Sequence, residues 1–146
     1  MKDLEISIDN NGTIETATIQ CNRRKLELTF IMKNGLTKTY SDYDMYACFG
    51  LLRADHPEIK FLCKGAKLNV HPSRMSSQMS TGLVAYELKL GIPSEEEDLV
   101  RIFDYEDENL TNNIEEQRTF YKRWLESLGI SLTIRGQESK GNSETP

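Results

Sequence analysis

Groups that bind metals or form disulfides are scarce in this 146-residue sequence. Its three cysteines lie far apart without a Cys-x-x-Cys pair, and its two histidines, His56 and His71, stand alone. Structural metal sites need such ligands at close spacing, and a disulfide framework needs an even number of cysteines. We therefore expect reduced thiols, no metal and no other cofactor.

Long apolar runs are absent as well. No stretch approaches the roughly 18 apolar residues that a membrane-spanning helix requires. No apolar region follows Lys2, so the first residues predict neither a secretory signal nor a membrane anchor. Both observations predict a cytoplasmic protein without a membrane partner.

Signatures of catalysis and nucleotide binding are also missing. The sequence has no Gly-x-Gly-x-x-Gly or Walker-type loop. His71 and Ser73 are close in sequence, but a nucleophile and its base rarely come from sequence neighbours, and His-Pro-Ser is typical of a turn. We therefore expect that the protein is not an enzyme. One alternative stays open, a small hydrolase or metal-free nuclease that uses His56 and His71, with Lys64 or Arg74 near the phosphate.

The residues that are present suffice for one globular core. The chain has a mass of 16.8 kDa, with 38% hydrophobic and 28% charged residues, which is typical of a single domain. Residues 135–146 contain no hydrophobic side chain and predict a disordered polar tail. The sequence therefore predicts one α+β domain over residues 1–134.

An antiparallel sheet is predicted from two early hairpins and later strands. The hairpins turn at Asp9–Gly12 and at Asn34-Gly35, where residues with φ > 0 are favoured. Apolar and polar residues alternate in the predicted segments 4–20, 26–40 and 83–90. Residues 59–63, between Pro57 and Gly65, predict a compact strand, and the short apolar run 99–103 predicts a strand or one helical turn. In the segment 83–90 one face is expected to carry Val84, Tyr86, Leu88 and Leu90.

Two main helices are predicted to pack on this sheet. Apolar residues at helical spacing indicate a helix over residues 42–55, capped by Ser41 or Asp42 and stopped by Pro57. A second helix is expected over residues 113–128, with a capping box that begins at Asn112 or Asn113 and with Gly129 at its end. Its buried stripe is predicted to contain Ile114, Phe120, Tyr121, Trp124, Leu125 and Leu128.

A loop of unusual length is predicted from Lys64 to Gly82, and loops this long are often functional. Met75 and Met79 lie four residues apart within it. Core packing is the usual role of such a pair, and an adaptable binding surface is the alternative.

Charge is concentrated in one segment. The chain has a net charge of −5, which disfavours nucleic acid as a direct partner. Residues 95–108 contain eight acidic residues and one arginine, a net charge of −7, so the remaining chain carries +2. The acidic residues are Glu95, Glu96, Glu97, Asp98, Asp104, Glu106, Asp107 and Glu108.

This acidic segment is a candidate binding site for a basic protein, because complementary charge speeds association and excludes wrong partners. Tyr105 would be its aromatic anchor. A solvated surface loop is the alternative. Calcium binding is disfavoured because the EF-hand spacing with its central glycine is missing.

Several segments of the sequence resemble small bacterial proteins that are encoded beside polymorphic toxins. The resemblance lies in the middle third of the chain, at Leu62–Met75, Gln78-Met79, Gly82–Leu90 and Glu97–Asp104. The sequence is most similar to immunity proteins of contact-dependent growth inhibition systems.

The resemblance implies a cytoplasmic protein that binds the C-terminal domain of one cognate toxin, often a nuclease. Stoichiometric binding would block the active site of the toxin or its access to substrate. With the acidic segment, a basic toxin domain is expected. An adaptor subunit of an obligate complex is the remaining alternative.

Overall fold

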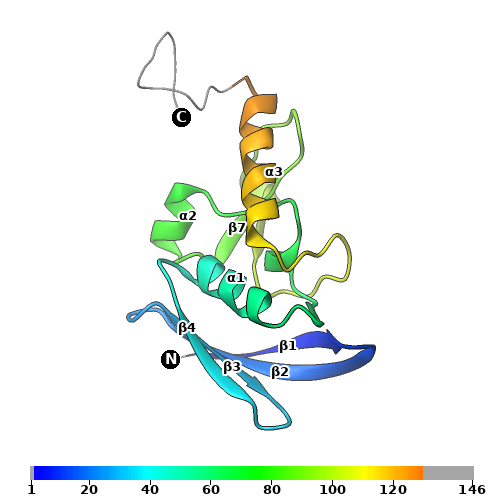
Figure 1. Cartoon of the computed structure of the whole chain (residues 1–146). Coiled ribbons are helices and arrows are strands. Elements are labelled where there is room, and N and C mark those ends of the chain that lie inside the picture. Colours follow the sequence, from blue (N-terminus) through cyan, green and yellow to red (C-terminus); the bar gives the residue numbers. More distant parts are fainter. Residues whose placement is uncertain (1, 130–146) are drawn as a thin grey trace.

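The computed structural model describes residues 2–129, and it confirms the α+β class (Figure 1). The predicted tail at 135–146 lies outside the described residues. One antiparallel sheet has five strands in the order β4-β3-β2-β1-β5, and a second has three in the order β6-β7-β8. The strands are β1 (Lys2–Asn10), β2 (Thr13–Asn22), β3 (Glu27–Met32), β4 (Thr37–Ser41), β5 (Ile59–Phe61), β6 (Val70–His71), β7 (Val84–Glu87) and β8 (Leu99–Arg101). The helices are α1 (Met45–Asp55), α2 (Arg74–Met79) and α3 (Ile114–Ser127), with 3₁₀ turns η1 (Lys64–Ala66) and η2 (Glu96–Asp98).

Both predicted hairpins are confirmed. Asn11 and Gly12 have φ of 54° and 94°, the conformation that a two-residue turn between twisted strands requires. This turn sets the register in which Asn10 pairs with Thr13 and Ile6 with Ala17. Period-two alternation then places one face of the five-stranded sheet in the core.

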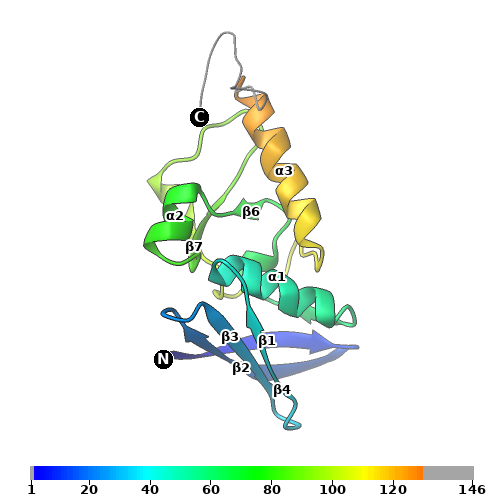
Figure 2. The same ribbon diagram turned by 60° about the vertical axis from the view of Figure 1, so that its left-hand side comes forward.

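Helix α1 lies between the five-stranded sheet and the upper layer of the molecule (Figures 1 and 2). Eight of its eleven residues are buried, as expected for a helix that is covered on both sides. Its N-cap is Asp44, whose carboxylate accepts a bond from Ala47 N at 2.8 Å, so the prediction of Ser41 or Asp42 as cap was wrong. The helix ends before Pro57, as predicted.

The upper layer contains the three-stranded sheet, α2 and α3 (Figure 2). The prediction of one long loop from Lys64 to Gly82 was wrong, because this segment forms η1, β6 and α2. Only β5 of the later strands joins the first sheet, through Ile8 and Phe61. The core is nevertheless continuous, since one cluster of buried residues extends from Ile6 to Ile102.

Strand β7 is shorter than the predicted segment 83–90, and of the four residues predicted on one face only Leu88, just beyond the strand, is buried. Ala85 is fully buried, whereas Val84 and Tyr86 are partly exposed and Leu90 lies beyond the strand with 43% of its surface exposed. Residues 99–101 form strand β8, which settles the choice between strand and helical turn.

Helix α3 packs on α1 and on β6. Its N-cap is Asn113, one of the two predicted caps, but the predicted capping box is not formed: Asn113 Oδ1 accepts from Glu115 N, and Asn113 N donates to Thr111 Oγ1. The helix ends before Gly129, whose φ of 82° is the left-handed conformation that favours glycine. Of the predicted buried stripe, only Trp124 is buried, with 7% of its surface exposed. The other five residues, Ile114, Phe120, Tyr121, Leu125 and Leu128, are partly exposed. At the crossing with α1, a Cβ on Gly50 would lie 2.6 Å from Ile114 Cδ1, so a larger residue there would require the isoleucine side chain to shift.

A buried polar junction joins α1, η1 and α3. The Arg53 guanidinium, fully buried, donates to Thr111 O at 2.6 Å and to Gln117 Oε1 at 2.8 Å. The Gln117 amide in turn donates to Gly65 O and Lys67 O at 2.8 and 2.7 Å. Burial lowers the pKa of Arg53 to about 10, so it stays charged at neutral pH. These bonds hold η1 in place, and η1 in turn is bonded to the loop of residues 104–108.

Candidate functional site

The acidic segment forms two groups at opposite ends of β8. Glu95–Asp98 form the turn η2, and Asp104–Glu108 follow the strand. The three residues of β8, which span about 10 Å, and the turn residues Ile102 and Phe103 separate the two groups. A hollow of about 400 Å³ lies along the strand between them, and it is lined by Lys64, Val84, Leu99, Val100, Arg101 and Asp104.

The first group is held by its own turn. Glu95 N donates to Asp98 Oδ2 at 2.9 Å, and Asp98 N donates to Glu95 O at 2.9 Å. Asp98 is therefore partly buried and used locally, while Glu95, Glu96 and Glu97 are exposed. Because Leu99 pairs with Tyr86, this turn lies beside the end of β7.

The backbone of the second group is bonded to the segment around η1. Lys64 N donates to Asp104 O at 2.8 Å, and Glu106 N donates to Leu62 O at 3.2 Å. Tyr105 forms an antiparallel bridge with Cys63. Since η1 is in turn held by the polar junction of Arg53, the acidic loop is anchored to the core.

Glu106 differs from the other predicted site residues because it is paired within the protein. Its Oε1 lies 3.0 Å from Lys67 Nζ and 3.3 Å from Lys64 Nζ, and only 15% of its side chain is exposed. Lys67 Nζ also contacts Glu87 Oε2 at 3.1 Å. Glu87 belongs to the end of β7 beside which η2 lies, so this ion cluster extends from the second acidic group towards the first.

The electrostatics of the cluster follow from these bonds. The hydrogen bond from Lys67 is the main reason that the pKa of Glu106 falls from 4.5 to about 2. Burial opposes the charge of Lys67, but its bonds to Glu106 and Glu87 outweigh this and raise its pKa. Both groups are therefore charged at neutral pH, and neither lysine is available to neutralise the outer carboxylates.

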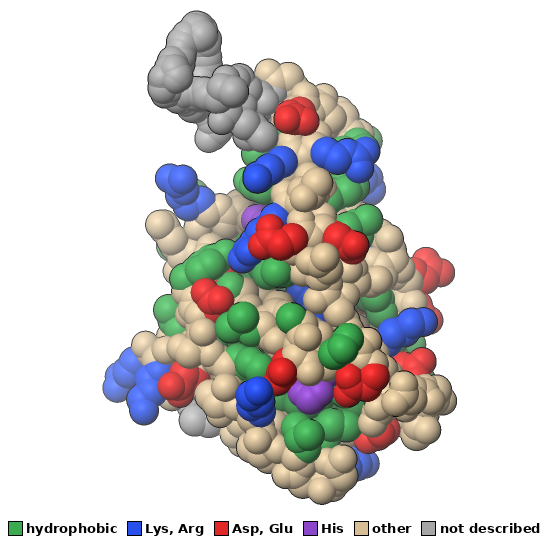
Figure 3. Space-filling view, viewed as in Figure 1, with side chains coloured by type: hydrophobic (Ala, Val, Ile, Leu, Met, Phe, Trp, Pro, Cys, Tyr) green, Lys and Arg blue, Asp and Glu red, His purple; other side chains and the backbone are tan. Residues whose placement is uncertain are grey.

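Six carboxylates remain exposed around this cluster, and within residues 2–129 none of them forms an ion pair. They belong to Glu95, Glu96, Glu97, Asp104, Asp107 and Glu108. Tyr105 lies among the second group with 60% of its surface exposed. In Figure 3, acidic side chains occur along the right-hand edge of the molecule. We refer to these six residues and Tyr105 as the acidic surface.

The two histidines have structural contacts. His71 stacks on Tyr121, with ring centroids 4.1 Å apart, and its Nδ1 lies 2.7 Å from Pro72 O. Burial lowers the pKa of His71 to about 4. Ser73 caps α2, since its Oγ accepts a bond from Ser76 N. His56 packs against Phe30, with ring centroids 5.5 Å apart.

Sequence reasoning missed the lysines that organise the site. Lys64 and Lys67 are about forty residues from Glu106, so no local pattern connects them. Arg53 and Gln117 could have been found, because each lies on an otherwise apolar stripe, four residues after Phe49 and seven before Trp124. A polar residue in such a position needs a buried partner.

Among the described residues, no group of three or more histidine, cysteine or carboxylate side chains could hold a metal ion. No helix within residues 2–129 has the length and apolarity to cross a membrane. No model of a known protein family matches the chain, and no curated protein matches it. The function must therefore be argued from the acidic surface and from the resemblance in sequence.

Proposed function

We propose that the protein is a cytoplasmic immunity protein that neutralises a basic toxin domain by stoichiometric binding. One observation carries the proposal. Among the described residues, six carboxylates without an ion pair flank β8. Three of them lie with Tyr105 on the loop 104–108, whose backbone is bonded to the core, and the other three lie on the turn η2. The nearby Lys64 and Lys67 are occupied by Glu106 and Glu87, so the surface keeps its negative charge.

The anchored loop suits inhibition by binding. A preformed surface loses little conformational entropy when it meets its partner. Exposed carboxylates would act mainly on the association rate and on the choice of partner, and Tyr105 would supply the buried aromatic contact that interfaces favour. The hollow along β8 offers space for a side chain of the toxin between the two acidic groups.

The rival functions have less support from the geometry. The stacked ring of His71 has a lowered pKa, and Ser73 is used as a helix cap, so these residues support a turn better than a hydrolytic site. For an adaptor subunit, no observation favours one partner over another.

Coexpression with the neighbouring toxin tests the proposal. The probe is the C-terminal domain of the secreted protein encoded immediately upstream, induced in cells with and without this protein. We expect growth to be restored and the two chains to co-elute in equal amounts. Growth arrest despite a folded protein, or the absence of such a neighbouring toxin, would contradict the proposal.

A paired variant separates binding from catalysis. His56→Gln with His71→Gln should protect cells as the unmodified chain does, because neither ring belongs to the acidic surface. The melting temperature of the variant is measured alongside. Loss of protection in a variant that remains folded would favour the hydrolase or nuclease.

A further inference from the structure

Helix α2 differs from an ordinary surface helix because its polar side chains, rather than its apolar ones, face the protein. Ser76 forms the capping box with Ser73, and Ser77 Oγ donates to the buried carboxylate of Asp44. Ser80, at the C-cap, donates to Ser76 O and accepts from Val84 N at 3.1 Å. These four serines are all partly buried. The helix is thus attached through hydrogen bonds rather than through apolar packing.

The apolar side chains of α2 point to solvent. Met75 and Met79 are 71% and 76% exposed, the two largest values among the large hydrophobic residues of the described chain. The expectation that this pair packs in the core was therefore wrong. At i and i+4 the two thioethers lie on one side of the helix. Folding gains almost nothing from them, and adjacent exposed apolar side chains are a feature of interaction sites.

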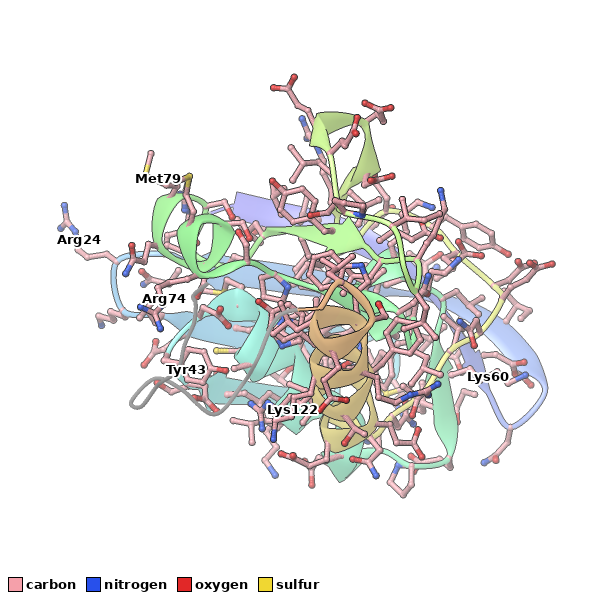
Figure 4. All side chains as sticks on the ribbon, turned by 90° about the horizontal axis from the view of Figure 1, so that it is seen from above. Arg24, Tyr43, Lys60, Arg74, Met79 and Lys122 are labelled. Carbon is pink, nitrogen blue, oxygen red and sulfur yellow. The ribbon has the colours of Figure 1, made fainter. Side chains whose placement is uncertain are left out.

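Basic side chains surround this methionine pair. The Arg23 guanidinium donates to Met79 O at 3.4 Å and to Thr81 Oγ1 at 3.1 Å, which holds it against the end of α2. Arg24 and Arg74 are exposed. Figure 4 shows Met79, Arg24 and Arg74 on the same side of the molecule, with Lys60 on the opposite side. Met75, Met79, Arg23, Arg24 and Arg74 are called the methionine face below.

An apolar cavity of about 400 Å³ adjoins this face at Arg23. Leu4, Leu83, Val84 and Phe103 line it, and each of them is partly buried. Arg23 and Arg101 add positive charge at its rim, while Glu5 and Asp104 add negative charge. Asp104 also belongs to the acidic surface, so the two surfaces meet at this rim. The methionine face and the rim together still have a net positive charge, because their arginines outnumber Glu5 and Asp104.

We propose that the methionine face and the adjoining cavity form a second docking surface, which binds an acidic protein segment with one apolar anchor side chain. The anchor enters the cavity, its neighbouring carboxylates meet Arg23, Arg24 and Arg74, and the methionines adapt to the apolar flank of the segment. The positive charge of the methionine face favours an acidic partner, whereas the acidic surface favours a basic one. This docking surface is additional to the acidic surface, which is proposed to bind the toxin.

Two other classes of partner fit the observations less well. Amphipathic helices that bind membranes present a wide apolar face, whereas α2 has six residues and two methionines. Proteins that bind single-stranded nucleic acid stack bases on aromatic rings, and the methionine face contains none.

Peptide selection and methyl NMR test this proposal. A random-sequence peptide library is selected on the immobilised full chain, and an enriched peptide is titrated into protein labelled at the methionine methyl groups. We expect enriched peptides to combine Asp or Glu with a large apolar residue. The methyl signals of Met75 and Met79 should shift on titration, while those of the buried Met32 and Met45 should not. A library that yields no binder, or binders without acidic residues, would overturn the proposal.

Variants with matched controls locate the contact. Met75→Gln with Met79→Gln should weaken binding of the selected peptide about tenfold, and Arg24→Glu with Arg74→Glu should do the same at low salt. Ile14→Gln removes an apolar side chain that is 64% exposed near the start of β2, and it should leave binding unchanged. Equal binding by the methionine variant, confirmed as folded by its melting temperature, would overturn the proposal.

Discussion

Replacing Lys67 by methionine tests whether the ion cluster holds the acidic loop in place. The variant keeps the aliphatic stem of the side chain but removes the ammonium that lies 3.0 Å from Glu106 and 3.1 Å from Glu87. Lys67 and Glu106 have side chains that are 11% and 15% exposed. Two carboxylates would then face each other at the end of β7 without their shared partner.

The expected loss of stability lies between that for breaking an exposed ion pair and that for breaking a fully buried one. Removing one partner of a fully buried ion pair costs about 3–5 kcal/mol. Lys64, at 3.3 Å from Glu106, still compensates part of the charge. We therefore expect a loss of about 2 kcal/mol, which corresponds to a melting temperature lower by about 6 °C for a domain of this size.

The pH dependence identifies the cause. Because the pKa of Glu106 is lowered from 4.5 to about 2, its stabilising effect is complete above pH 4.5 and disappears as the pH falls towards 2. Denaturant unfolding should show that the difference between the parent and Lys67→Met shrinks over this range. Lys38→Met is the control, since the Lys38–Asp55 pair is 55% and 40% exposed and its loss should change stability little. Equal effects of the two substitutions, or a difference that is independent of pH, would refute the reasoning.

Three further substitutions test the packing that supports the site. Gln117→Leu leaves the buried Arg53 guanidinium without its side-chain partner and should lower the free energy of unfolding by about 3 kcal/mol in denaturant titrations. Burial lowers the pKa of His71 from 6.5 to about 4, so between these pH values the imidazole binds a proton in the unfolded chain but not in the folded one. The free energy of unfolding should therefore fall by about 3 kcal/mol as the pH drops through this range. In His71→Phe this dependence of stability on pH should disappear. Gly65→Ala would place a Cβ 2.6 Å from that of Ile102 and should destabilise the fold by about 2 kcal/mol, with a lower melting temperature as readout.

Local patterns predicted the hairpins and the C-terminal ends of the long helices. Asn11-Gly12 can adopt the positive φ that a tight turn needs, Pro57 cannot continue a helix, and Gly129 adopts the left-handed conformation at the end of α3. These effects act within a few residues, so the sequence alone reveals them.

The remaining features depend on contacts distant in the sequence. Helix α2 was not predicted because its serines, which usually indicate a loop, form caps and bonds to Asp44. The acidic segment was located by composition, but the pairing of Glu106 with Lys64 and Lys67 arises only when the chain folds back on η1. Sequence therefore identified the charge of the candidate site but not which carboxylates are exposed.

Association kinetics test the central claim, that the acidic surface binds a basic toxin domain. One variant replaces Glu95, Glu96 and Glu97 by glutamine, and a second replaces Asp104 and Asp107 by asparagine and Glu108 by glutamine. Glu106 is retained in both.

Stopped-flow mixing with the upstream toxin domain is carried out over a series of salt concentrations. We predict that at least one variant associates several-fold more slowly at low salt, and that the difference vanishes when salt screens charges beyond about 8–10 Å. Association of both variants at the parental rate across the whole series would contradict the account.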